Sequence, residues 1–336
     1  MSRQALLRVD GLQKLFPIKK GFWKRTVGHV RAVDGVTFHI DEGETLGLVG
    51  ESGCGKTTTA RCILRAVEPT AGEILMRVSD GSEIELGRLR PAELRALRRE
   101  MQMIFQDPFT SLNPRMTLLD LVGEPLLVHG MKNREEREVR VADLLRRVGL
   151  RPEYMRRFPH AFSGGERQRI GIARALALHP RLVVADEPVS ALDVSVQAQI
   201  LNLLIDLQSE FRLTYLFVAH DLSVVRHISN RVAVMYVGRI VELGTTAELF
   251  TAPKHPYTAA LLSAVPEPDP RAPSRRIMLE GEVANPAAPP PGCYFHPRCP
   301  YAIDKCRTEA PSWREISPAH FAACHRAEEL QLAGVE

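Results

Sequence analysis

The stretch Gly50-Glu-Ser-Gly-Cys-Gly-Lys-Thr-Thr-Thr59 decides how the rest of the sequence is interpreted. It fits the pattern G-x-x-x-x-G-K-[ST] and follows an apolar run, residues 46–49, that predicts a short buried strand. The glycines allow backbone N–H groups to curl around phosphate oxygens, Lys56 can reach the terminal phosphates, and the Thr57 hydroxyl can bind Mg²⁺. The alternative is a glycine turn without a ligand. The stretch predicts a cradle for a nucleoside triphosphate.

The composition is that of a globular protein without an obvious nucleic-acid surface. Of the 336 residues, 45% are hydrophobic and 25% charged, and the formal net charge is only +4. One short basic cluster, Lys19, Lys20, Lys24 and Arg25, is expected to be a solvated loop. Residues 1–10 lack a secretory pattern, and no stretch reaches the roughly 18 apolar residues of a membrane span. We expect a cytosolic chain whose membrane association comes through partners.

Apolar runs alternate with helical patterns along most of the chain, which favours a parallel sheet covered by helices. The expected strands are residues 6–12, 30–40, 46–49, 73–78, 101–105, 182–185 and 214–219. The expected helices are residues 56–66, 91–99, 118–128, 134–148 and 163–179, and one with Val196, Ile200, Leu203, Leu204 and Leu207 on one face. Residues 17–28 are expected to form a loop, and residues 107–180 a helical insertion.

Two carboxylates follow the apolar run 182–185. Beside a phosphate loop, Asp186 could hold Mg²⁺ through water and Glu187 could polarise an attacking water. Adjacent carboxylates usually just face solvent, so this interpretation depends on the preceding phosphate loop. Gln106 directly follows the strand 101–105, at the edge where ligands of open α/β sheets bind.

A second glycine-containing stretch, Ser163-Gly164-Gly165, lies at the expected start of a helix. The serine hydroxyl, the exposed N–H groups and the helix dipole all favour an anion there. The alternative is an ordinary serine N-cap, which this stretch alone would favour.

Taken in order, these features resemble the nucleotide-binding domain of ATP-binding cassette (ABC) proteins over about residues 6–244. The residues that carry the resemblance are the phosphate loop, Gln106, Ser163-Gly-Gly-Glu-Arg-Gln, Asp186-Glu187, Ser190-Ala-Leu-Asp193 and His220. The resemblance implies an α/β fold of the P-loop ABC-type ATPase, with a mixed or parallel sheet and a helical subdomain. We expect this domain over residues 1–245, followed by a small cysteine-rich extension over residues 246–336.

The resemblance also implies roles. Gln106 would sense metal and water, Glu187 would be the catalytic base, and His220 would contact the γ-phosphate. Ser163 and Gly165 would act across a dimer on the partner's nucleotide, and Asp193 would link the two sites. The implied ATP-binding set is Phe16, Gly50, Ser52, Gly53, Cys54, Gly55, Lys56, Thr57, Thr58, Ser163, Gly164, Gly165 and Asp193, and the implied Mg²⁺ set is Thr57, Gln106 and Asp186.

Phe16 and the serine-glycine stretch 163–165 allow more than one interpretation. Phe16 would stack on the base, although a buried core position is an equal alternative. The serine-glycine stretch departs from the common family form. That form has Leu before the serine and Gln after the glycines, whereas this sequence has Phe162 and Glu166 at these positions. We expect the change to tune the dimer interface without abolishing hydrolysis.

Three further stretches resemble the ATPases of oligopeptide and dipeptide importers: residues 105–114, residues 255–262 and the cysteine tail. In that family two related ATPases lie beneath two membrane subunits that an extracytoplasmic binding protein feeds. The resemblance implies a second ATPase subunit, a place on the cytoplasmic face of the membrane, and no nucleic-acid partner. The alternatives are a soluble non-transport ABC ATPase, an importer for another solute such as nickel or glycosides, and a module that binds ATP without turnover. Glu187 and His220 argue against the last.

The tail carries four of the six cysteines behind a segment, residues 265–291, with eight prolines. Cys293, Cys299, Cys306 and Cys324 are separated by 5, 6 and 17 residues. Four cytosolic thiols with little apolar sequence around them are explained by a metal that supplies folding energy, about 10–16 kcal/mol for structural zinc. Sulfur ligation suits zinc or an iron–sulfur cluster, and four unligated thiols remain the third alternative. The importer resemblance favours a [4Fe-4S] cluster, whereas Cys54 and Cys62 are not expected to be ligands.

Overall fold

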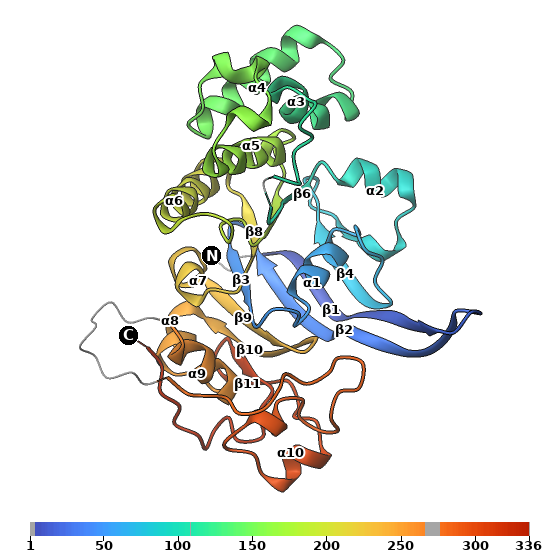
Figure 1. Cartoon of the computed structure of the whole chain (residues 1–336), viewed down its shortest axis with the longest axis vertical. Coiled ribbons are helices and arrows are strands. Elements are labelled where there is room, and N and C mark those ends of the chain that lie inside the picture. Colours follow the sequence, from blue (N-terminus) through green and yellow to red (C-terminus); the bar gives the residue numbers. More distant parts are fainter. Residues whose placement is uncertain (1–3, 108, 266–275, 336) are drawn as a thin grey trace. The chain divides into compact units, whose positions relative to one another are not determined.

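The computed structural model describes residues 4–107, 109–265 and 276–335 (Figure 1). The chain divides into two compact units, each described by itself. The first comprises Met1–Leu7, Ile40–Thr45 and Leu75–Val218, and the second comprises Arg8–His39, Leu46–Ile74 and Ala219–Glu336. Part of the expected proline-rich segment, residues 266–275, and Pro108 of the stretch 105–114 lie outside the described residues.

Parallel strands form the sheet of the first unit. The order is β8 (Thr214–Ala219), β7 (Leu182–Asp186) and β6 (Met101–Ile104), with Ala185 opposite both Ile104 and Phe217. Strands β7 and β8 are buried along their whole length, as expected of a parallel sheet covered on both faces. A short strand, β5 (Glu83–Glu85), pairs with the last three residues of β4 (Ala71–Arg77).

The helical insertion is present in the first unit. Its helices are α3 (Leu118–Val128), α4 (Arg134–Arg147) and α5 (Gly164–Leu176), of which α3 contacts both others, and α2 (Pro91–Leu97) and α6 (Val194–Phe211) flank it in sequence. Short 3₁₀ turns are η1 (Leu86–Arg88), η2 (Pro152–Arg156) and η3 (Pro159–Ala161). Polar N-caps define the helix starts: Thr117, Asn133, Ser163 and Asp193 each accept a hydrogen bond from a backbone N–H of the first turn.

The second unit contains a mixed sheet in the order β11 (Arg314–Ser317), β12 (His320–Ala322), β10 (Arg239–Thr245), β9 (Arg231–Tyr236) and β3 (Thr45–Val49). In this sheet β3 and β9 are parallel, whereas the β9–β10, β10–β12 and β12–β11 pairs are antiparallel. Its helices are α1 (Lys56–Ile63), α7 (Leu222–Ile228), α8 (Thr246–Thr251), α9 (Pro256–Ser263) and α10 (Asp304–Thr308), with the 3₁₀ turn η4 (His296–Arg298). Helix α1 ends earlier than expected because Arg65 adopts a left-handed conformation, φ 47°.

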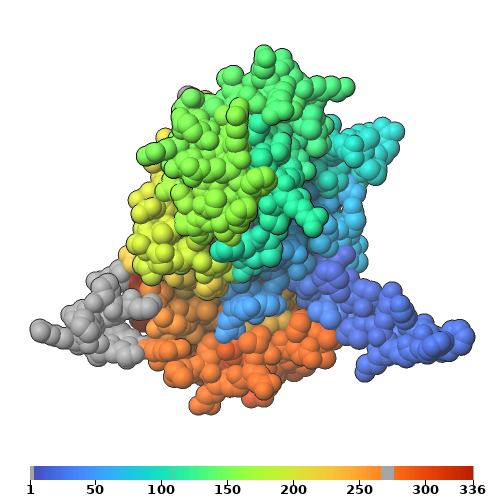
Figure 2. Space-filling view, turned by 45° about the horizontal axis from the view of Figure 1, so that its top comes forward, coloured from blue at the N-terminus to red at the C-terminus, as the bar shows by residue number. Residues whose placement is uncertain are grey.

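The prediction of a loop over residues 17–28 is wrong. Strands β1 (Ala5–Lys20) and β2 (Arg25–Asp41) continue to a tight turn, where the Lys24 N–H donates to the Gly21 carbonyl over 3.1 Å. Pro17 is exposed, and proline is tolerated in a strand where its missing N–H would face solvent. The basic cluster is solvated as expected, but it lies at the tip of a β-hairpin, which Figure 2 shows in blue.

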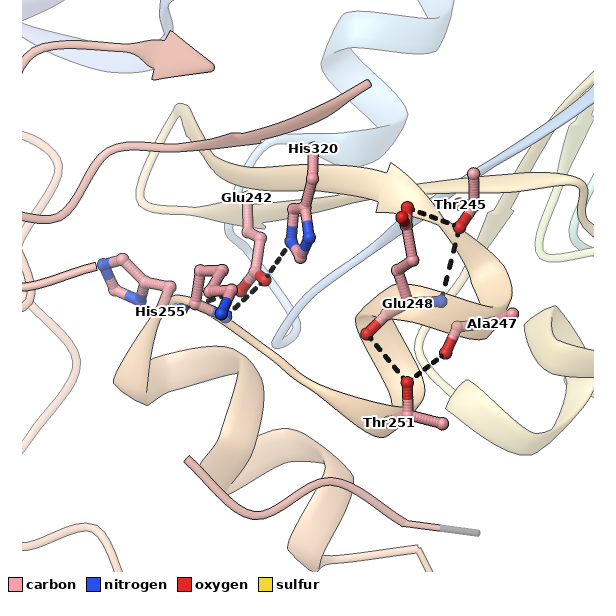
Figure 3. A network of polar contacts seen from close by, with 8 residues as sticks. Glu242, Thr245, Ala247, Glu248, Thr251, His255 and His320 are labelled. Atoms are coloured by element: carbon pink, nitrogen blue, oxygen red, sulfur yellow. Dashed lines mark hydrogen bonds and ion pairs between the residues drawn. The ribbon is translucent and has the colours of Figure 1, made fainter. Parts of the chain in front are cut away.

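The cysteine tail joins the sheet of the second unit through a buried carboxylate (Figure 3). Strand β12 pairs with β10, and Glu242 of β10 is fully buried. Its carboxylate contacts His320 Nε2 at 2.7 Å and accepts from the N–H groups of Lys254 and His255 at 2.6 and 2.9 Å. A buried charge is costly unless such partners satisfy it, so this network attaches the tail to β10.

No helix in the described ranges has the length and apolar character needed to cross a bilayer.

Candidate active site

The glycine-rich loop between β3 and α1 is tightly wrapped in the second unit. Gly50 and Gly55 have φ values of 153° and 109°, which side-chain-bearing residues rarely adopt. A Cβ at Gly50 would lie 2.1 Å from the Met235 carbonyl oxygen, and one at Gly55 would lie 2.1 Å from that of Ala32. Only glycine fits at both positions, so the backbone follows the tight path that the predicted phosphate cradle requires.

Lys56 lies inside this loop with 4% of its surface exposed. Its ammonium donates to the carbonyls of Gly50 and Glu51 at 2.7 and 3.1 Å. The side chain is therefore held at the loop, where a phosphate-binding lysine is needed. Thr57 and Thr58 are partly exposed on the first turn of α1, and Ser52 and Gly53 are exposed at the mouth of the loop.

The two cysteines of this region are interior groups. Cys54 and Cys62 are buried, and burial raises the pKa of both thiols, that of Cys62 to about 11. Cys54 contributes to the loop through its backbone, whose carbonyl accepts from the Gly238 N–H at 2.8 Å.

The loop is also held by residues far along the chain. The Glu51 N–H donates to the Tyr257 hydroxyl at 2.9 Å, and the Glu51 carboxylate accepts two hydrogen bonds from Arg298 at 2.8 and 3.1 Å. Sequence reasoning missed both partners because each lies more than 200 residues from Glu51. In the sequence, the stretch 255–262 and the cysteine tail indicate only the importer family. Their contacts with the phosphate loop could not be predicted from it.

The carboxylate pair and the glutamine meet in the first unit. Asp186 is the buried last residue of β7, and Glu187 follows it with φ 47°, a strained conformation for glutamate. The Gln106 amide donates to the Glu187 carboxylate at 2.9 Å. The contact arises because both residues follow the ends of the neighbouring parallel strands β6 and β7.

Ser163 caps helix α5 in a capping box with Glu166. The Glu166 carboxylate accepts from the Ser163 N–H and hydroxyl, both at 2.9 Å, and the Glu166 N–H donates to the Ser163 oxygen at 3.4 Å. A Cβ at Gly165 would lie 2.5 Å from Val196, so this position also needs glycine. The ordinary N-cap is thus present, on a serine that is exposed at the start of the helix.

Asp193 caps helix α6 in the same unit. Its carboxylate accepts from the Ser195 hydroxyl at 2.7 Å and the Val196 N–H at 3.0 Å. The Ser195 hydroxyl is the largest cause that lowers the pKa of Asp193, followed by the Val196 N–H, so the residue stays ionised at the helix start.

The remaining nucleotide residues lie in the second unit. His220 is exposed directly before α7. Phe16 is 40% exposed, with the Lys14 ammonium 5.0 Å from its ring centroid. The alternative that Phe16 belongs to the core is therefore wrong, and its stacking role stays a prediction.

All four cysteines of the tail line one small pocket. None forms a disulfide, and burial with the neighbouring thiols raises the pKa of Cys293, Cys299 and Cys324 to about 11. The donor chemistry suits a thiolate-bound metal or cluster, which would have to displace the protons. In their present positions, however, the described side chains include no group of three or more His, Cys, Asp or Glu residues arranged to hold a metal ion.

Solved structures define the class. The chain is similar to the dimeric ATP-binding cassette MJ0796, with TM-score 0.62 and 30% identity over 71% of this chain and 98% of that one. The same protein in a dimeric post-hydrolysis state bound to ADP and Pi gives the same values. The fold and the loop are those of an ABC ATPase.

Sequence relatives define the family. The ABC transporter family matches residues 33–190, and the family described as "Oligopeptide/dipeptide transporter, C-terminal region" matches residues 241–306. The oligopeptide transport ATP-binding protein AppF of Bacillus subtilis is 53% identical over 96% of this chain and 98% of its own length. The probable peptide ABC transporter ATP-binding protein y4tS of Sinorhizobium fredii is 53% identical over 96% and 90%. The chain belongs to the ATP-binding subunits of ABC transporters, in the branch with the oligopeptide/dipeptide-type C-terminal region.

Proposed function

We propose that this subunit hydrolyses ATP to drive import of di- or oligopeptides. The observation that carries the proposal is the 53% identity with an oligopeptide transport ATP-binding protein over nearly the full length of both chains. The tail supports it, because the oligopeptide/dipeptide C-terminal family matches from residue 241 onwards. Nothing in an ATP site reads a peptide, so the solute comes from relationship and needs its own test.

The P-loop would bind the triphosphate. Lys56 would move from the carbonyls of Gly50 and Glu51 to the terminal phosphate oxygens, and the N–H groups of the loop would surround the β-phosphate. Thr57 would bind Mg²⁺ directly, and Asp186 would hold it through water. Thr58 would contact phosphate, and Phe16 would stack on the base.

Glu187 would act as the general base for the attacking water. Its contact with Gln106 supports this role, because an amide that senses metal and water must reach the same position. His220 would contact the γ-phosphate. The left-handed backbone at Glu187 is consistent with a catalytic residue held in a strained conformation.

ATP would be bound between two such subunits, identical or related. Ser163 and Gly165 would contact the nucleotide held by the partner's P-loop, and Asp193 would link the two sites. The γ-phosphate would favour the closed pair because only that pair contacts it from both halves, and hydrolysis would remove those contacts. The dimeric state of the MJ0796 cassette bound to ADP and Pi supports this arrangement.

The assembly would lie on the cytoplasmic face of the membrane. Two permease subunits would be its direct partners, an extracytoplasmic binding protein an indirect one, and nucleic acid none. Residues 1–245 would form the ATPase domain and residues 246–336 its importer-type extension.

The replacement Glu187→Gln tests the hydrolysis mechanism. The amide cannot accept a proton, so we expect ATP turnover to fall at least about 100-fold while ATP-dependent dimers persist. Asp206→Asn, on the exposed face of α6, is the matched control and should retain the wild-type rate. Unchanged turnover in Glu187→Gln would exclude Glu187 as the base.

The solute is tested in cells that lack the chromosomal copy. Uptake of labelled di- and oligopeptides, nickel and a glycoside is compared after complementation with wild type or Glu187→Gln. We expect wild type alone to restore peptide uptake. Restoration of nickel or glycoside uptake instead would assign another solute, and no effect on any uptake would favour a non-transport ATPase.

We further propose that Cys293, Cys299, Cys306 and Cys324 hold a [4Fe-4S] cluster, which would supply the ligand bonds that fix the tail. Their shared pocket supports the proposal, although the side chains must move to ligate it. Anaerobic purification followed by iron and acid-labile sulfide analysis tests it, with Cys299→Ser as the loss variant. Zinc without sulfide, or neither metal, would exclude the cluster and leave the ATPase proposal intact.

A further inference from the structure

An arginine of the cysteine tail reaches into the P-loop. Arg298 ends the 3₁₀ turn η4, one residue before Cys299, and 8% of its side chain is exposed. Its two Nη atoms donate to the two carboxylate oxygens of Glu51 at 2.8 and 3.1 Å. Such a two-bond contact fixes orientation as well as distance, because the planar guanidinium matches the carboxylate.

The tail sets the position of this arginine. The guanidinium lies 6.0 Å from the ring centroid of Tyr236, which packs edge-on against Phe295 with centroids 5.3 Å apart. Tyr257 contacts both of these rings, and all three aromatic side chains are buried. Phe295 also lines the cysteine pocket. The same packing therefore supports the pocket on one side and Arg298 on the other.

The N–H, the carbonyl and the carboxylate of Glu51 all form hydrogen bonds. Its N–H donates to the Tyr257 hydroxyl at 2.9 Å, and its carbonyl accepts from the Cys54 N–H at 3.3 Å and from Lys56 at 3.1 Å. Its carboxylate is paired with Arg298. An unpaired carboxylate at this position would repel the triphosphate, because Glu51 is the second residue of the phosphate-binding pattern.

We propose that Arg298 is a positioning residue of the nucleotide site. It holds Glu51, neutralises its charge beside the phosphates, and so makes ATP affinity depend on the tail that carries the four cysteines. The proposal rests on the nucleotide-binding role of the P-loop given above.

The ion pair differs in its burial from an exposed pair of the same tail. The Arg314–Glu328 pair of the same tail also measures 2.8 Å, but its side chains are 35% and 63% exposed, against 8% and 27% for Arg298 and Glu51. Exposed pairs are screened by water and salt and contribute little, whereas breaking a mostly buried pair leaves an unpaired charge. Arg314→Ala is therefore the matched control.

Equilibrium binding of MgATP to the full chain tests the proposal in a double-mutant cycle. We expect Arg298→Ala to raise the Kd about tenfold or more and Arg298→Lys to raise it less, while Arg314→Ala has no effect. Glu51→Gln added to Arg298→Ala should recover most of the affinity, because the unpaired charge is gone. A wild-type Kd in Arg298→Ala, or independent effects of the two replacements, would overturn the proposal.

Urea unfolding of each variant separates positioning from loss of folding, because Glu51→Gln removes the unpaired charge and could restore stability as well as affinity. A raised Kd in an Arg298→Ala chain that is still folded under the binding conditions supports positioning. Lys56→Ala separates the two proposals. If Lys56→Ala leaves MgATP binding intact, the P-loop assignment fails. If Lys56→Ala weakens MgATP binding but the Arg298 variants do not, the inference about Arg298 fails and the P-loop assignment stands.

Coupling between two sites is reciprocal, so nucleotide should also act on the tail. Hydrogen exchange of the backbone amides of residues 293–306 should slow on addition of MgATP in wild type, and this dependence should be lost in Arg298→Ala. Equal rates with and without nucleotide in wild type would contradict the link.

Discussion

Two glycine-containing loops of this chain look alike in sequence and differ in how they are supported. The P-loop contains glycines with positive φ values, and the Lys56 ammonium donates to a carbonyl of the loop. Its Glu51 is hydrogen-bonded to Tyr257 and Arg298. The start of α5 has only its own capping box, in which Glu166 occupies the exposed Ser163 hydroxyl. Under the proposed function, the first loop would hold phosphate with groups of one chain alone. The second is a polar helix end that would become a site only with a nucleotide held by the partner.

The largest effect should come from the cradle. Lys56→Ala removes the ammonium that binds phosphate, and charge-assisted contacts of this kind are worth roughly 2–3 kcal/mol, so ATP affinity should fall about 100-fold. Equilibrium binding measures this, with the exposed Lys132→Ala as the charge-matched control. Undiminished binding would mean that the two loops do not differ as described.

Ser163→Ala should affect a different step. A lone chain should bind ATP within about twofold of wild type, whereas ATP-dependent dimerisation and hydrolysis should fall about tenfold, because the proposed contact of the hydroxyl is with the partner's nucleotide. Thr117→Ala is the control, since Thr117 caps α3 with Asp120 in the same way. Both variants should lose about 1 kcal/mol of stability, which isothermal unfolding measures. If the two variants dimerise equally well, Ser163 only caps helix α5 and does not act on the partner's nucleotide.

Acid should weaken the support of the P-loop and leave the start of α5 unaffected. His255 accepts from the Tyr257 N–H, and full burial lowers its pKa to about 3, from about 6.5 in an unfolded chain. Between these values only the unfolded chain takes up this proton, so stability should fall by about 1.4 kcal/mol per unit as pH decreases below 6.5.

Urea unfolding at about pH 7.5 and about pH 5 measures this loss. His255→Asn keeps an acceptor for the Tyr257 N–H and should reduce the pH dependence, whereas replacement of the exposed His29 should not. An unchanged slope in His255→Asn would show that other groups carry the acid sensitivity.

The smallest effect concerns Glu166. Glu166→Gln can keep the capping bonds but removes a negative charge from the place where a partner's phosphate would lie. Helix α5 should lose a few tenths of a kcal/mol, whereas ATP-dependent dimers should tighten about twofold. Glu136→Gln, in the first turn of α4, should lower stability alike without changing dimerisation. Weaker dimers in Glu166→Gln would show that the carboxylate is required there.

Sequence patterns predicted most of what lies close along the chain. The range of α3 was predicted to the residue, and Gln106 and Glu187 were each placed at the end of a strand, although their contact was not predicted. The extension of β1 to Lys20 was missed because Pro17 and the basic residues resemble a loop.

Long-range support of the site could not be predicted in this way. Arg298 reaches Glu51 across 247 residues of sequence, and no periodicity or motif spacing encodes such a pair. The shared pocket of the four cysteines was implied by residue type, but residue type does not specify which metal group it suits. Contacts of this kind depend on how complete elements pack, which appears only in the folded chain.

The division of roles between the loops is tested most directly with mixed dimers. Lys56→Ala and Ser163→Ala chains are given different tags, combined, and isolated as pairs that carry both tags. If Ser163 acts on the partner's nucleotide, one site of each pair has an intact lysine and an intact serine, so ATP hydrolysis should reappear well above that of either parent. Mixed dimers as inactive as their parents would contradict the account.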